Sequence, residues 1–102
     1  MSTQNISYTL TLIDDNSLQI NFTDAWYQED TPSLTAYLFE QLGNCSTLEV
    51  ILGADRENCR FEWQQNYFIL NFECYSQSCW IENETATDLA TLNVIKQQLE
   101  NN

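Results

Sequence analysis

The feature that most constrains this chain is the apolar and aromatic segment from Cys59 to Glu82. Its apolar side chains recur at every second position in two sets: Cys59, Phe61 and Trp63, then Phe68, Leu70, Phe72 and Cys74. A period of two is typical of strands with one buried face. With a hairpin tip at Gln65 and Asn66, Trp63 opposes Phe68 and both sets fall on the same face. We therefore predict a three-stranded meander whose last, short strand runs from Cys79 to Glu82.

The remaining elements follow from similar patterns. Alternation predicts strands at 6–13, 18–22 and 46–52. Thr31 and Pro32 indicate a helix start, in which the Thr hydroxyl caps backbone N–H groups, and Gly43 indicates its end. Thr85 and Asp88 have capping-box spacing before a second amphipathic helix. The unit formed by strand 18–22, the first helix and strand 46–52 is compatible with a right-handed crossover between parallel strands.

The resulting order is ββαβββ(β)α, within a single domain spanning residues 1–102. Because each strand is apolar on one face only, we predict an α+β two-layer sandwich. Its sheet is mainly antiparallel, and both helices pack on one face. We expect the following residues to be buried against the helices: Tyr8, Leu10, Ile20, Phe22, Leu48, Val50, Phe61, Trp63, Phe68, Leu70 and Phe72.

The charge of the chain limits the kinds of partner that it can bind. Fifteen acidic and three basic residues give a formal net charge of -12. Such a surface repels phosphate backbones and anionic lipids, so we expect neither nucleic acid nor membrane as a partner. The first residues lack the pattern of a signal peptide, so we expect a cytoplasmic protein. In size and charge the chain is similar to small acidic bacterial proteins of unassigned function.

The chain contains no histidine. This removes the commonest general base, the histidine-dependent nucleophiles and every metal site that uses imidazole. No Gly-rich phosphate loop is present, and Lys96, the single lysine, lies on a polar predicted helix. We therefore predict a protein that is not an enzyme, with no catalytic residues, no metal site and no cofactor.

The four cysteines leave three interpretations open. The predicted registers bring Cys59, Cys74 and Cys79 to the buried face near one end of the sheet. They are interpreted as buried structural thiols, as a thiol-based metal or redox site, or as including a disulfide between Cys74 and Cys79, which would face each other across a hairpin. Their spacing contains no pair of cysteines separated by two other residues, the usual zinc-binding signature.

The outward face of the sheet carries apolar and aromatic side chains among carboxylates. The candidate partner-binding residues on it are Glu49, Ile51, Glu62, Tyr67, Ile69, Glu73 and Trp80. Trp26 and Tyr27, in an acidic loop, are further candidates, although Trp26 also suits the edge of the core. A helix-free face of this composition is typical of an interaction surface. The alternative interpretation is an ordinary solvated sheet face, since such faces often carry a few apolar residues.

We expect a non-catalytic protein-binding module of the adaptor, inhibitor, immunity or chaperone type. Its partner would be a basic or partly apolar protein, or a second copy bound through the open sheet face. The alternatives are a thiol-based metal or redox protein that uses Cys59, Cys74 and Cys79, and a DNA-mimic inhibitor. The mimic requires carboxylates in rows at phosphate-like spacing.

Overall fold

The computed structural model describes residues 6–13, 16–84 and 90–101. The predicted capping box at Thr85 and Asp88 lies outside these residues. The elements are β1 (Tyr8–Ile13), β2 (Ser17–Phe22), the 3-10 helix η1 (Gln28–Asp30), α1 (Thr31–Leu42), β3 (Ser46–Leu52), β4 (Arg56–Trp63), β5 (Asn66–Glu73), β6 (Ser78–Asn83) and α2 (Ala90–Glu100). No helix in the described part of the chain has the length and apolarity needed to cross a membrane.

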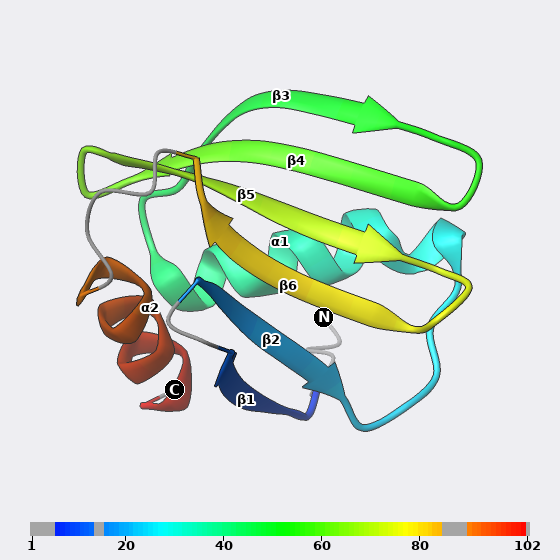
Figure 1. Ribbon diagram of the computed structural model, residues 1–102, viewed down its shortest axis with the longest axis horizontal. Coiled ribbons are helices and arrows are strands. Elements are labelled where there is room, and N and C mark those ends of the chain that lie inside the picture. Colours follow the sequence, from blue (N-terminus) through cyan, green and yellow to red (C-terminus); the bar gives the residue numbers. More distant parts are fainter. Residues whose placement is uncertain (1–5, 14–15, 85–89, 102) are drawn as a thin grey trace, which may run out of the picture.

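The described strands form one six-stranded sheet in the order β1-β2-β6-β5-β4-β3, and every neighbouring pair is antiparallel. Both helices lie on the same side of this sheet, which confirms the predicted two-layer α+β sandwich (Figure 1). β2 and β3 point in the same direction, so α1 forms the suggested crossover between parallel strands, but the two strands are not neighbours, because β2 pairs with β6 and β3 lies at the far edge. The short last strand of the meander, β6, is an interior strand that joins the two halves of the sheet.

The β4–β5 hairpin differs from its predicted register by two residues. Its turn is Gln64 and Gln65, both with positive φ, as a two-residue type I′ turn requires. Trp63 therefore opposes Asn66, and Phe61 opposes Phe68. Because the shift is an even number of residues, the apolar side chains remain on the predicted face.

The core between the sheet and the helices contains most of the predicted residues. Ile20, Phe61, Trp63, Phe68, Leu70 and Phe72 are buried, and Tyr8, Leu10 and Phe22 are partly buried against them. The prediction that Leu48 and Val50 are buried is wrong, since every residue of β3 is exposed. β3 lies at the edge of the sheet, beyond the helices (Figure 1).

The start of α1 shows a different hydrogen bond from the one predicted. The helix begins at Thr31, but its N-cap residue is Asp30, which makes no side-chain capping bond. The Thr31 hydroxyl instead donates to a carboxylate oxygen of Glu57 on β4, at 2.6 Å. Both side chains are buried, so this bond joins the helix to the sheet inside the core. The predicted end of the helix at Gly43 is confirmed.

Candidate functional site

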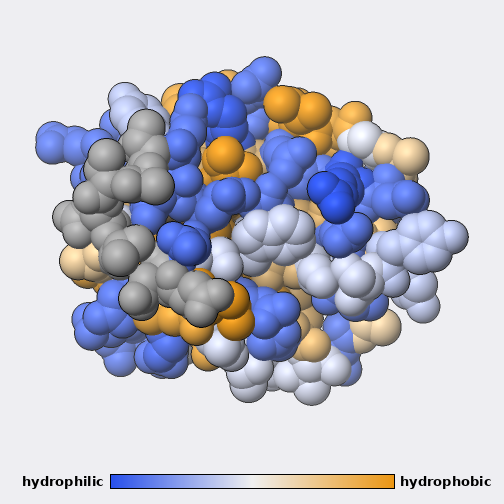
Figure 2. Space-filling view, in the orientation of Figure 1, coloured by the Kyte–Doolittle hydropathy of each residue, from blue (hydrophilic) through white to orange (hydrophobic). Residues whose placement is uncertain are grey.

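The helix-free surface of the sheet, here called the open face, brings seven of the predicted residues together. Cross-strand pairs place them on the same side of four adjacent strands, namely Glu49 and Ile51 on β3, Glu62 on β4, Tyr67, Ile69 and Glu73 on β5, and Trp80 on β6. Figure 2 shows this side of the molecule. Hydrophilic residues dominate it, with weakly polar residues in the middle and a hydrophobic cluster at its upper right.

The middle of the open face is a polar network centred on Asn71. One row of cross-strand neighbours contains Ile51, Asn58, Asn71 and Trp80. The Asn71 side chain accepts a hydrogen bond from Asn58 and donates to Glu82 at 2.9 Å. Asn71 is buried although it points away from the helices. The sequence analysis missed Asn71. The pattern that could have identified it is a pair of asparagines, Asn58 and Asn71, at polar positions of two adjacent strands.

The charges of the open face are only partly balanced. Arg60 pairs with Glu84 at 2.7 Å and with Glu49 at 3.2 Å, and these hydrogen bonds raise the pKa of Arg60. Arg56 pairs with Glu73 at 3.4 Å. Within the described part of the chain, Glu62 has no cationic partner. The open face therefore combines exposed or half-buried apolar side chains with an excess of carboxylates.

The acidic loop does not join the open face. Trp26 is buried on the helix side, where its ring meets Phe72 edge-to-face with centroids 5.4 Å apart. The Gln77 side chain makes two hydrogen bonds to the backbone of Trp26. It accepts from the Trp26 N–H at 2.9 Å and donates to the Trp26 carbonyl oxygen at 2.7 Å. Trp26 thus fills the edge of the core, whereas Tyr27 is exposed.

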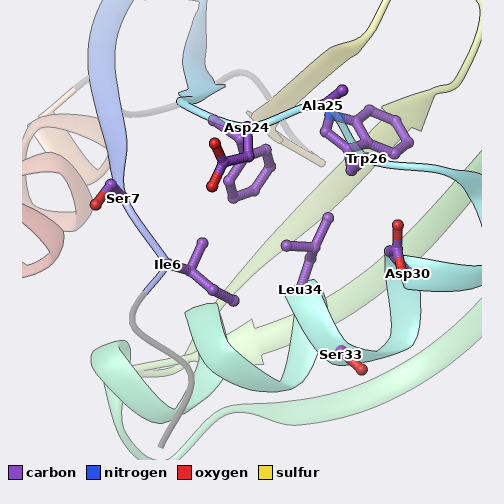
Figure 3. A pocket seen from close by; sticks show the side chains of 9 residues that line it. Ile6, Ser7, Asp24, Ala25, Trp26, Asp30, Ser33 and Leu34 are labelled. Atoms are coloured by element: carbon purple, nitrogen blue, oxygen red, sulfur yellow. The ribbon is translucent and has the colours of Figure 1, made fainter.

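Beside Trp26 lies a cavity of about 280 Å³ that sequence reasoning did not predict (Figure 3). Its apolar wall contains Trp26 and Leu34, and the carboxylates of Asp24 and Asp30 lie at its rim. Asp30 already accepts a hydrogen bond from the Tyr27 backbone N–H at 2.8 Å. The cavity arises where the residues just before β1, the loop after β2 and the first turn of α1 meet, so only the tertiary arrangement creates it.

The four cysteines lie outside the loop that carries Trp26, and all are free thiols. Cys59 and Cys79 are buried, opposite Leu70 and Phe72, while Cys45 and Cys74 are half-buried. Burial raises the pKa of the Cys45 thiol to about 12 and also raises those of Cys59 and Cys79. Thiols of this kind are poor nucleophiles at neutral pH. Among the described residues, no group of three or more Cys, Asp or Glu side chains is placed to share a metal ion.

Comparison with protein-family models gives a match to most of the chain. Residues 9–100 match a family model described as a protein of unknown function (DUF3630). The chain belongs to the DUF3630 family. No curated protein and no solved structure matches it. The matched range runs from the second residue of β1 to the end of α2, so it includes both helices and the whole sheet except Tyr8.

Proposed function

We propose that this protein is a non-catalytic, cytoplasmic binding module that engages a basic protein partner through the open face. The observation that carries the proposal is the composition of this face. Apolar and aromatic side chains from β3, β5 and β6 lie among carboxylates, and the described helices all lie on the opposite side of the sheet. A surface of this kind offers contact area and charge complementarity together.

The aromatic residues supply the contact area. Tyr67 is exposed and Trp80 is half-buried, so their rings lie at the surface while the sheet holds their backbones. Such residues concentrate interface energy because they bury a large area with few rotatable bonds. The Asn71 network joins β5 and β6, the strands that carry these two rings, to each other and to β4, which reduces the ordering cost of binding.

The carboxylates select the partner. A net charge of -12 attracts basic proteins over distances of about one Debye length, ~8–10 Å at physiological salt, and it repels nucleic acid. Glu62, which has no cationic partner among the described residues, is the open-face carboxylate best placed to meet a lysine or arginine. Binding should therefore weaken as salt increases.

The test compares matched variants in affinity capture from native lysate, followed by titration of the captured partner. Trp80→Ala should weaken binding, and the double reversal of Glu62 and Glu73 to Lys should slow association and reduce its salt dependence. The control reverses Glu29 and Glu40 to Lys, which changes the net charge equally at exposed positions of η1 and α1. Equal binding by both double variants, together with unchanged binding by folded Trp80→Ala, would refute the open face as the binding site.

A further inference from the structure

The two edge strands of the sheet differ in how they are covered. β1 is tied to α2 by a hydrogen bond from the Tyr8 hydroxyl to the Leu99 carbonyl oxygen at 3.1 Å, and its helix-facing residues are half-buried. In β3, by contrast, every residue is exposed. Val50 is 49% exposed, Ile51 50% and Leu52 69%. Apolar side chains therefore reach solvent from both faces of β3.

β3 also lacks most of the sequence features that keep edge strands from pairing with other chains. Lysine, proline and inward-pointing charges usually serve this purpose, and the sequence STLEVIL contains neither lysine nor proline. Its single charge, Glu49, is held by Arg60 on the open face. The one irregularity is a bulge between Thr47 and Glu49, so the strand is regular from Glu49 onward.

The hydrogen bond at the end of β3 shows which backbone groups are free. The Gly53 N–H donates to the Arg56 carbonyl oxygen at 2.7 Å, across the turn to β4. Backbone groups alternate in direction along an antiparallel strand. Gly53 and Ile51 therefore face β4, while the N–H and C=O groups of Val50 and Leu52 face outward from the sheet.

We propose that β3 pairs with β3 of a second copy, antiparallel about a two-fold axis at Ile51, to form a homodimer with one continuous sheet. In this register Ile51 faces Ile51 of the other copy, and Val50 faces its Leu52. Glu49 faces Gly53, so no two carboxylates are opposed. A two-fold axis at Glu49 would instead place two carboxylates opposite each other, which is destabilising.

The chemistry of this strand favours a second copy over a basic peptide. A basic strand would meet only one carboxylate in β3, and Arg60 already occupies it. The same apolar strand in antiparallel orientation places an aliphatic side chain opposite each of Val50, Ile51 and Leu52. The axis is perpendicular to the sheet, so the two open faces lie side by side and remain free. This dimer therefore does not depend on the proposed partner binding.

The opposing force is the repulsion between two bodies of charge -12. Salt screens this repulsion, so dimerisation should strengthen with sodium chloride, whereas binding of a basic partner should weaken. We would measure the mass of the purified protein by sedimentation over a range of concentrations and salt. A mass that stays at the monomer value of 11.9 kDa under all conditions would overturn the proposal.

Matched variants locate the interface. Ile51→Lys places two ammonium groups at the axis and should raise the dimer dissociation constant at least about tenfold. Ile13→Lys makes the same change on the opposite edge strand at a residue 42% exposed, and it should leave the dimer intact. Dimerisation unchanged by Ile51→Lys, or lost equally in both variants, would overturn the assignment to β3.

Cross-linking tests the register without relying on a charge change. In the proposed pairing, Ile51 forms a non-hydrogen-bonded pair, with Cα atoms about 4.5 Å apart and within disulfide range. Ile51→Cys should therefore give a covalent dimer under oxidising conditions. Leu52→Cys should not, because its equivalent in the other copy is a diagonal neighbour about 7–8 Å away. The reverse pattern, or cross-linking by wild type alone to the same extent, would overturn this register.

Discussion

Phe72→Ala tests whether the helix face of the central strands holds the fold together. Phe72 is 2% exposed on β5, between Glu57 of β4 and Cys79 of β6. Its ring also meets Trp26 edge-to-face, at an interplanar angle of 74°. One substitution therefore removes contacts to two neighbouring strands and to the loop that leads into α1.

The expected cost follows from these contacts. Truncation of a buried Phe to Ala costs about 3–5 kcal/mol through lost burial and the cavity left behind. The edge-to-face pair with Trp26 carries about 0.5–1.5 kcal/mol beyond area burial, so we expect the upper half of that range. Domains of this size have a total unfolding free energy of about 5–15 kcal/mol. The variant should be folded but close to its stability limit.

Urea unfolding followed by tryptophan fluorescence and circular dichroism measures this change. With a slope of about 2 kcal/mol per molar urea, a loss of about 4 kcal/mol lowers the midpoint by about 2 M. Tyr75→Ala is the control, because Tyr75 is 85% exposed in the turn that follows β5, and it should change stability by less than about 0.5 kcal/mol. A loss below about 1 kcal/mol for Phe72→Ala, with an unchanged slope, would refute the burial argument.

Three further predictions concern polar groups and charge. Thr31→Val removes the hydroxyl bound to buried Glu57 and should lower the unfolding free energy by about 1.5–3 kcal/mol in urea melts. Thr35→Val is the control, because the buried Thr35 hydroxyl has no partner among the described residues. An equal loss of unfolding free energy in both variants would contradict the role of the bond between Thr31 and Glu57. The melting temperature should rise between low and moderate sodium chloride, because salt screens the repulsion within a chain of charge -12, and a falling trend would show that ion pairs dominate. The contribution of Cys45 to stability should be constant below pH 9 and fall between about pH 9 and 12, because the unfolded Cys45 thiol ionises near its ordinary pKa of 9.0 while the folded thiol keeps its proton until about 12. Cys45→Ala should reduce the alkaline slope in urea melts at several pH values, and an unchanged slope would count against this assignment.

The sequence determined which face of most elements is buried. The alternation around Phe61, Trp63, Phe68 and Leu70 identifies the helix face correctly even though the predicted hairpin register was two residues off. Side chains alternate with a period of two, so an error of two residues leaves every face unchanged. The seven open-face residues were predicted together for the same reason. Local patterns also identified Gly43 as the end of α1, because only the local backbone is involved.

The tertiary structure decided the strand order and what each face meets. β3 alternates much as β4 does, yet Leu48 and Val50 are exposed, because β3 lies at the edge of the sheet beyond the helices. Likewise, β6 is short but interior, and it pairs with both β2 and β5. Such neighbours are set by contacts between residues far apart in the chain, which a period of two does not encode. The Asn71 network, the bond between Thr31 and Glu57, the cavity beside Trp26 and the free edge of β3 arise in the same way, because each depends on which distant segments the fold brings together.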